Sequence, residues 1–527
     1  MDIFNPDRFE HFAADGIRAA TAEGQQLLFV PAEALRRTAR TAFERLSFTF
    51  TRGHLERLIA ACTAPDSSDN DRYVCATILR NAEEAAHGEL PLCQDTGIAC
   101  IFGFKDNGVI VQGDEKAALS EGTEHVYRTR PLRMSTSCPR SFFDEYDPGN
   151  NMPAQVLVQS GSNGLAGPAY RLLFSAKGGG SSNKTTLLQC TKAVLNDSAF
   201  RQLLREQIAR LGVSACPPYT ICVVAGGLSP EHNLYALKLA TCGECIVPGD
   251  AFWEQEVMRI AEDTGLGAQF GGRRMCIDAK VLRLPRHGAS CPVSIGVSCC
   301  AHRNLNAFIT SDGIFIERTV LNPAELPGFA EAAAFAGHGK EQARVSTEGG
   351  IASVLRQLHG MSPGSRVLLS GRILVARDAA HARWQALLDS GRPLPSYCTQ
   401  YPICYAGPAQ TPEGKPTGSF GPTTAGRMDS YAGALMSRGA ALVTIAKGNR
   451  SAGWAAACKQ YGAFYLGMPG GVAALIASRY ITSVEVLDYP ELGMEAVRLV
   501  SVRDMPAFVI TDNTGADFYE QCASQRA

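Results

Sequence analysis

The sequence has no excess of charge of either sign and no long apolar run. Its 50 Lys and Arg residues balance 51 Asp and Glu residues, so there is no overall positive field to attract nucleic acid or an anionic membrane surface. No stretch reaches the ~18 uninterrupted apolar residues that cross a bilayer. The first residues lack a basic region followed by an apolar one, which argues against a secretory signal. We therefore expect a soluble, cytoplasmic protein with neither a nucleic-acid nor a membrane partner.

The sequence also lacks the short motifs that usually mark nucleotide and zinc sites. Its triple glycine, residues 178–180, matches neither GxGxxG nor GxxxxGK[ST], so nucleotide binding is not supported. Eighteen cysteines over 527 residues are only moderately enriched, and their irregular spacing fits a reducing compartment better than a disulfide framework. No second CxxC or His pair accompanies Cys242 and Cys245, which we interpret as part of a surface loop.

Periodicity and turn signals divide the chain into two α/β units. A length of 527 residues favours roughly two to four domains. Glycines and a proline interrupt the pattern over 337–365, which we interpret as a linker between a larger N-terminal domain, 1–336, and a smaller C-terminal domain, 366–527. Alternating strands and helices predict an α/β fold for the second domain. The predicted helices are 32–46, 74–87, 252–263, 378–390 and 452–461, and the predicted strands are 279–284, 293–299, 366–376, 441–447 and 463–467.

A glycine-rich break lies between a predicted strand and a predicted helix in the first domain. The strand covers 168–176, the break covers 177–183, and a helical pattern runs from about Lys184 to Leu211. Glycines there would let backbone amides approach an anion at the start of the helix. A plain sharp turn is the alternative interpretation.

Three cysteines stand in separate loop-like stretches with polar neighbours. Cys93 begins Cys-Gln-Asp-Thr-Gly, Cys216 precedes two prolines, and Cys299 ends an apolar stretch that follows His287. Zinc ribbons and ferredoxins gather their ligands at short local spacings, so a site here must be assembled by tertiary folding. Three ligands would leave one iron of an iron–sulfur cluster open, which suggests Lewis-acid chemistry. Buried thiols that pack as small hydrophobic groups are the alternative.

Several further motifs make the chain similar to a known family. Over nearly its whole length the chain resembles the class I, iron–sulfur-dependent fumarate hydratases. The matching stretches are 92–97 (LCQDTG), 176–181 (AKGGGS), 265–272 (GLGAQFGG), 286–299, 405–408 (YAGP), 421–430 (GPTTAGRMDS), 446–450 (AKGNR) and 489–495 (YPELGME).

The resemblance implies a homodimeric hydro-lyase of the tricarboxylic acid cycle that interconverts fumarate and (S)-malate. Its C-terminal domain would swivel to close the active-site cleft. Such hydration needs a Lewis acid, a base and cations that bind the dicarboxylate. By resemblance the ligands of a [4Fe–4S] cluster are Cys93, Cys216 and Cys299. The implied catalytic residues are Asp95, Thr423 and His287, and the implied substrate-binding residues are Gln94, Arg133, Gly179, Arg377, Arg427 and Lys447.

The chain also departs from the family pattern, and several questions stay open. Ser294 and Cys300 stand where the family usually has Gly and Ser, so Cys300 competes with Cys299 as the third ligand. Residues 134–147 match poorly, which leaves mesaconate/citramalate or tartrate as alternative substrates. A cluster-based sensor that binds nucleic acid, and a protein whose cysteines are simply core, are the other classes. Thr423 is either the base or only a hydrogen-bond donor to substrate.

Overall fold

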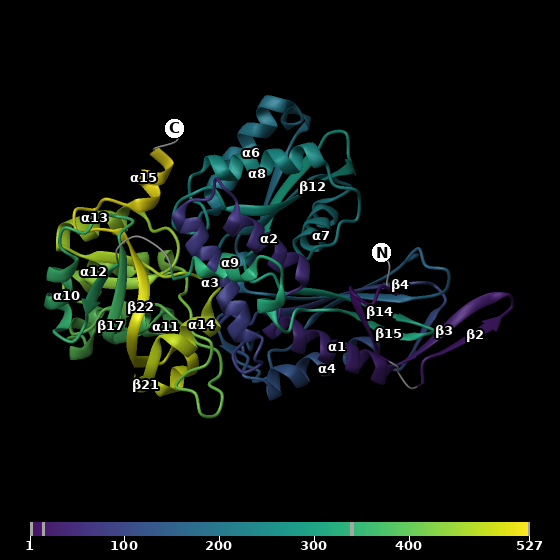
Figure 1. The fold of residues 1–527 in the computed structure, drawn as a ribbon, viewed down its shortest axis with the longest axis horizontal. Helices are drawn as coiled ribbons and strands as arrows, with labels where there is room; N and C mark the ends of the chain where they lie inside the picture. The colour runs from purple at the N-terminus through teal and green to yellow at the C-terminus, as the bar shows by residue number, and fades with distance from the viewer. Residues whose placement is uncertain (1–3, 13–15, 338–341, 525–527) are drawn as a thin grey trace.

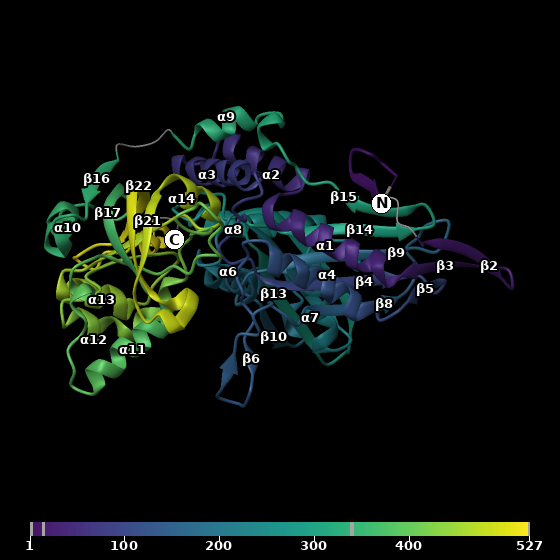
Figure 2. The ribbon, with the colours of Figure 1, turned by 90° about the horizontal axis from the view of Figure 1, so that it is seen from below.

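The chain folds into two units that lie side by side (Figures 1 and 2). The structure is a computed structural model, and it describes residues 4–12, 16–337 and 342–524. None of the helices in these ranges has the length and apolarity needed to span a bilayer. Helices and strands occur in both units, which confirms the predicted α/β class.

The N-terminal unit is built around two sheets. Helices α1 (Ala32–Phe48) and α4 (Glu115–Thr129) pack on the larger sheet, and the apolar face of α1 inserts Leu35 and Phe43 into its core. In order across that sheet, the strands are β1 (Phe9–Phe12), β15 (Gly313–Glu317), β14 (Asn304–Thr310), β9 (Tyr170–Lys177), β4 (Ile98–Lys105) and β8 (Gln155–Ser160).

The second sheet carries two of the three candidate cysteines at its ends. Helices α7 (Pro230–Thr241) and α8 (Ala251–Asp263) pack on it, and α6 (Asp197–Leu211) packs on α8. Its strands, in order, are β10 (Thr186–Cys190), β13 (Cys291–Ser298), β11 (Tyr219–Gly227) and β12 (Cys276–Arg286).

The prediction of one helix over 184–211 is wrong in its first part. Residues 186–190 form β10, which pairs with β13, and the helix begins only after Asn196, whose side chain accepts a hydrogen bond from the Ala199 N–H. The glycine-rich break is followed by a single helical turn, α5 (Gly179–Ser182), which is too short to act as an anion-binding helix N-terminus.

The C-terminal unit is a seven-stranded mixed sheet covered by helices. Strands β16 to β20 run parallel, and β22 is antiparallel to β17, β20 and β21. In order, the strands are β16 (Ala343–Ser346), β17 (Arg366–Val375), β18 (Ile403–Cys404), β19 (Val443–Ala446), β20 (Phe464–Gly467), β22 (Val497–Thr511) and β21 (Ile481–Asp488). The helices are α10 (Gly350–Leu358), α11 (Asp378–Asp389), α12 (Ala432–Met436), α13 (Ala452–Tyr461), α14 (Ala473–Arg479) and α15 (Phe518–Ser524).

Much of the predicted linker 337–365 belongs to this second unit. Its residues 338–341 lie outside the described residues. The described remainder contains β16, which pairs with β17, and α10. We therefore place the start of the C-terminal unit at about Ala343, because a strand that is hydrogen-bonded into a sheet is part of that sheet's domain.

One apolar core continues from one unit into the other. Helices α2 (Arg52–Thr63), α3 (Asp69–Ala85) and α9 (Phe329–Ala334) form a layer of the N-terminal unit, and α14 of the second unit packs on α3. Phe270 stacks on Phe508 across this junction, with ring centroids 3.9 Å apart.

Further short strands are β2 (Arg18–Ala22), β3 (Gln25–Pro31), β5 (Val109–Gln112), β6 (Cys138–Pro139) and β7 (Glu145–Tyr146).

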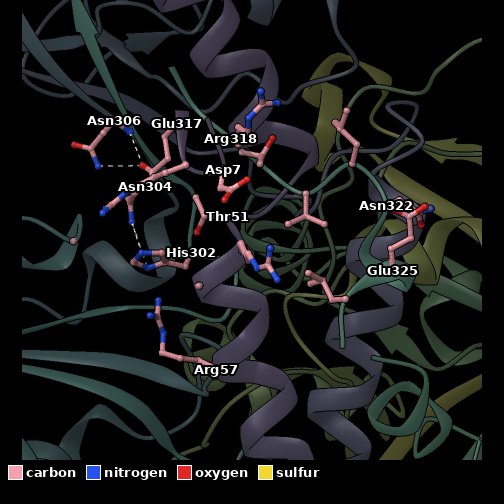
Figure 3. A pocket seen from close by; sticks show the side chains of 18 of the residues that line it. Asp7, Thr51, Arg57, His302, Asn304, Asn306, Glu317, Arg318, Asn322 and Glu325 are labelled. Carbon is pink, nitrogen blue, oxygen red and sulfur yellow. Dashed lines mark hydrogen bonds between the residues drawn. The ribbon is translucent and has the colours of Figure 1, made fainter. Parts of the chain in front are cut away.

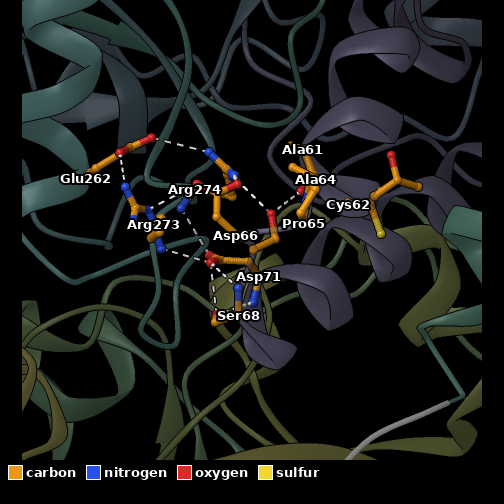
Figure 4. A network of polar contacts seen from close by, with 12 residues as sticks. Ala61, Cys62, Ala64, Pro65, Asp66, Ser68, Asp71, Glu262, Arg273 and Arg274 are labelled. Atoms are coloured by element: carbon orange, nitrogen blue, oxygen red, sulfur yellow. Dashed lines mark hydrogen bonds and ion pairs between the residues drawn. The ribbon is translucent and has the colours of Figure 1, made fainter.

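A buried carboxylate holds the glycine-rich loop 265–272 in place (Figure 4). Asp71, at the start of α3, is fully buried and accepts hydrogen bonds from the backbone N–H groups of Ala268, Arg273 and Arg274. Ser68 completes a capping box with it. The loop is thus fixed by one side chain that satisfies three backbone donors.

Candidate active site

A cavity of about 340 Å³ lies where the two units meet, and it collects the predicted site residues. Residues from both units line it. Every predicted site residue except His287 is among them: Cys93, Gln94, Asp95, Arg133, Gly179, Cys216, Cys299, Arg377, Thr423, Arg427 and Lys447.

The three cysteines reach this cavity from three separate loops. Cys93 follows α3, Cys216 lies between α6 and β11, and Cys299 directly follows β13. Cys216 has a φ of 63°, a left-handed conformation that is uncommon outside glycine. The Cys300 N–H donates to the Cys216 carbonyl at 3.0 Å, so the second and third loops are tied together. Cys216 and Cys299 are therefore placed by the same local contact.

Cys300 is not among the residues that line the cavity. It is fully buried and its Sγ lies 3.7 Å from the carbonyl oxygen of Gly470. A Cβ added to Gly471 would collide with this sulfur. Of the two neighbouring cysteines, Cys299 alone lines the cavity among the described residues.

The donor set suits a polynuclear cluster better than one ion. Within the described ranges, no group of three or more His, Cys, Asp or Glu is arranged to hold a metal ion, yet three thiols line one cavity. Burial raises the pKa of Cys93, and it raises that of Cys216 to about 11. The Lys447 ammonium donates to Cys216 Sγ at 2.7 Å and opposes that rise. Three spread thiols beside a cation fit an anionic, thiolate-held cluster.

Asp95 and Arg133 form an ion pair at one end of the cavity, 2.7 Å apart. Burial alone would raise the pKa of Asp95, but Arg133 and Arg303 hold it below its usual value. The Gly179 N–H also donates to Asp95 at 2.9 Å. The family resemblance predicts that this amide binds a carboxylate of the substrate, but in the structure it binds the carboxylate of Asp95. Gly178 is required beside Asp95, because an added Cβ would lie 2.9 Å from its carboxylate.

Arg377 and Arg427 line the cavity from the C-terminal unit. Arg377 follows β17 at the carboxyl end of that parallel strand, where α/β folds place ligand contacts. It pairs with Glu495 at 2.9 Å, whereas its buried Nη1 has no hydrogen-bond partner. Arg427 pairs with Asp378 at 3.0 Å. The unpartnered Arg377 Nη1 is a donor available to a ligand.

Thr423 and Lys447 are held side by side by backbone pairing. The Lys447 N–H donates to the Thr423 carbonyl at 3.2 Å, and the Thr423 N–H donates to the Tyr405 carbonyl at 2.7 Å. The Thr423 hydroxyl is buried without a hydrogen-bond partner. A buried hydroxyl left unpaired is costly, so a group that enters the cavity would gain its hydrogen bond.

Sequence reasoning missed several polar residues that line the cavity, among them Lys177, Lys184, Ser214 and Arg303. Arg303 is 3% exposed, and its Nη2 donates to the Asp95 carbonyl at 2.8 Å. Its position directly after the Cys299 run was the available signal. Lys177, Lys184 and Arg303 add to the predicted arginines and Lys447. Positively charged side chains therefore far outnumber carboxylates in the cavity, where Asp95 is the one carboxylate among the described lining residues.

Two sequence-based expectations are not met. His287 is exposed in the turn between β12 and β13, where its Nδ1 accepts from the Ala289 N–H, and it does not line the cavity of its own chain. Cys242 is buried at the end of α7 rather than exposed in a surface loop, and Cys245 is partly buried. Cys242 belongs to an apolar cluster between α7 and the larger sheet, and Cys245 packs against a cluster formed by α7 and the second sheet.

Comparison with known proteins gives matches over almost the entire chain. The family described as "Fumarate hydratase (Fumerase)" matches residues 36–307, and "Fumarase C-terminus" matches residues 318–522. The "Fumarate hydratase class I, aerobic" of Salmonella typhimurium is 44% identical over 97% of this chain and 89% of its own.

Two further relatives agree with this match. "Fumarate hydratase 2" of Leishmania major is 44% identical over 94% of this chain and 88% of its own. The "Fumarate hydratase class I, anaerobic" of Escherichia coli is 43% identical over 99% of this chain and 96% of its own.

Proposed function

This chain belongs to the class I fumarate hydratase family, and from this premise we propose that it interconverts fumarate and (S)-malate. The observation that carries the proposal is the cavity itself, which places three thiols, an acid, a hydroxyl and several cations around one space. Cys93, Cys216 and Cys299 would hold a [4Fe–4S] cluster. When bound, such a cluster supplies a Lewis acid for adding or removing hydroxide.

The arginines bind the two carboxylates of the substrate. Arg377 and Arg427 offer planar forks that suit one carboxylate, and Arg377 has an Nη1 without a hydrogen-bond partner. Asp95 holds Arg133 and the Gly179 N–H, and Arg133 lies near Arg377, since both contact Gly407. Because these groups come from both units, the substrate bridges them, and closure of the cleft would exclude other water.

Two groups divide the proton transfer. On the family resemblance we assign Asp95 the role of acid, positioned by Arg133 and the Gly179 amide. Although burial would raise its pKa, its charged neighbours lower it, so Asp95 must take up a proton before it can act as an acid. Thr423 removes the proton alpha to the carboxylate, because its unpaired hydroxyl faces the cavity beside Lys447, whose charge would stabilise an alkoxide. The competing assignment keeps Thr423 as a hydrogen-bond donor to substrate while another group takes the proton.

The assignment of Thr423 is tested by two variants. If Thr423 is the base, the two variants Thr423→Ser and Thr423→Val should differ strongly in kcat. Thr423→Ser keeps a hydroxyl and should retain most of kcat, whereas Thr423→Val should lower kcat by about two to four orders of magnitude. A pure binding role predicts that Val mainly raises KM.

Fumarate is the substrate we propose, and direct turnover decides it. Chain reconstituted anaerobically with iron and sulfide should convert (S)-malate to fumarate, followed by ultraviolet absorbance, and lose activity in air. Citramalate and tartrate serve as competing substrates. A higher kcat/KM for either would replace fumarate hydration, and an inactive protein that retains a cluster would refute the hydro-lyase. We extend the proposal to a cytoplasmic homodimer on the family resemblance, to be checked by sedimentation.

A further inference from the structure

A second cavity, larger than the candidate active site, lies on the N-terminal unit. Its volume is about 930 Å³, and its walls come from α2, β14, β15 and the segment that leads to α9. Figure 3 shows its polar side chains, which include Arg57, His302, Asn306 and Glu317. We call it the Arg57 cavity. None of the predicted site residues lines it.

The Arg57 cavity contains a guanidinium without a counter-charge. Arg57 is half-buried on α2, its Nε is buried without a partner, and within the described ranges its side chain makes no hydrogen bond or ion pair. Figure 3 shows it directed toward His302. Of the other lining cations, Arg52 pairs with Glu56 at 2.8 Å, Arg318 donates to the Pro6 carbonyl at 2.6 Å, and Arg8 lies over the Phe9 ring. The lining carboxylates, Asp7, Glu244, Glu317 and Glu325, form no ion pair with Arg57 among the described residues. An unneutralised, partly desolvated arginine is a binding group for an anion.

The histidines beside Arg57 cannot neutralise its charge, and they leave room for an anion. The ring of His302 stacks on that of the fully buried His54, with centroids 5.3 Å apart. Burial, and then the Arg57 charge, lower the pKa of His302 to about 3, so both rings are neutral near pH 7. Farther along the wall, Glu317 accepts two hydrogen bonds from Asn306, whose own Oδ1 is buried without a donor. These acceptors suit hydroxyl groups on a ligand.

A single segment separates the Arg57 cavity from the candidate active site. Along residues 299–304 the side chains alternate: Cys299, Ala301 and Arg303 line the active site, and His302 and Asn304 line the Arg57 cavity. The His54 Nε2 atom lies 2.8 Å from the carbonyl oxygen of Cys300, so α2 is joined to the same segment. A ligand that contacts His302 therefore contacts the segment that also carries Cys299, a proposed cluster ligand.

We propose that the Arg57 cavity binds a small hydroxylated anion, a carboxylate or a phosphate, and that this ligand changes substrate binding through residues 299–303. The acidic group lies against Arg57, and the hydroxyl groups donate to Glu317 and Asn306. Binding is a property of the cavity alone. Its effect on turnover rests on the proposed function.

Calorimetry with two probes, inorganic phosphate and malonate, tests the site at constant ionic strength. The reconstituted full chain should bind at least one probe at a site that survives Arg377→Gln, which disables the candidate active site. Arg57→Gln should weaken this binding by about tenfold or more, as expected for loss of a charged hydrogen-bonding partner. Arg57→Lys should recover part of it, and Arg80→Gln on α3 serves as a matched control, since Arg80 pairs with Glu83 outside the cavity.

The outcomes separate the possibilities. Tighter phosphate binding identifies a phosphorylated ligand, and tighter malonate binding identifies a carboxylate. The proposed site is overturned by any of three results. These are equal affinity of Arg57→Gln and the unaltered chain for both probes, loss of all binding in Arg377→Gln, and no binding of either probe. A saturating probe should shift KM for malate in the unaltered chain and not in Arg57→Gln. Binding without that shift overturns the coupling, and inactivity of every chain despite Arg57-dependent binding overturns the proposed function alone.

Discussion

Replacing Gln269 should weaken both the junction of the two units and the loop that carries Cys216. Gln269 is 2% exposed, and its Nε2 donates to the carbonyl oxygens of Pro217 at 2.8 Å and Gly470 at 3.1 Å. Its Oε1 accepts from the Gly470 N–H at 2.7 Å. One side chain thereby joins the residue after Cys216 to the C-terminal unit.

The magnitude follows from the three hydrogen bonds that Gln269→Ala removes. Each contributes about 1 kcal/mol net, and a buried donor such as the Gly470 N–H left without a partner costs about 1–3 kcal/mol more. The expected loss is therefore about 4–6 kcal/mol. Gln269→Glu keeps the shape but sets a carboxylate against two carbonyl oxygens, so at neutral pH it should destabilise the chain at least as much.

Urea unfolding followed by circular dichroism, together with iron content after anaerobic reconstitution, measures this effect. Both Gln269 variants should unfold at lower urea and bind less iron. Gln385→Ala is the control, because Gln385 is only partly buried on α11 and its side chain hydrogen-bonds to Asp389 one turn away, and it should change stability by no more than about 0.5 kcal/mol. Normal unfolding and full iron content in Gln269→Ala would refute this account of the junction.

Three further predictions concern the cluster, the substrate and pH. Cys93→Ala and Cys299→Ala should abolish the visible absorbance and iron content, and Cys300→Ala should leave both largely intact; the reverse result would move the third ligand to Cys300. Arg377→Lys should lower kcat/KM by an amount equivalent to about 2–5 kcal/mol, because a point charge cannot reproduce a bidentate contact, and unchanged kinetics would place Arg377 outside the site. Burial lowers the pKa of the fully buried His381 to about 4, so the unfolded chain takes up this proton below about pH 6.5 and the folded chain does not. The free energy of unfolding therefore decreases as the pH falls from about 6.5 toward 4, and the decrease that His381 causes is about 2 kcal/mol at pH 5. Melting temperatures of His381→Asn measured over this pH range should not show that part of the decrease.

The secondary structure followed from the sequence where local signals were strong. The helices α1, α8, α11 and α13 lie where apolar periodicity and alternation predicted them, because an amphipathic stripe needs only neighbouring residues to specify it. The error over 184–211 arose at β10, a short strand that exists because β13 is available to pair with it. Tertiary pairing overrode the local helical pattern there.

The sequence by itself determined the family and the α/β class, and it pointed to part of the cavity lining, because the motifs around Cys93, Cys216, Thr423 and Lys447 are recognisable one by one. Only the tertiary structure decided how those motifs face one another. It placed Cys299 in the lining of the cavity and left Cys300 out of it, since the Cys300 N–H is fixed to the Cys216 carbonyl and its sulfur lies against Gly470. Side-chain direction in a loop is set by such distant contacts, which no local pattern encodes.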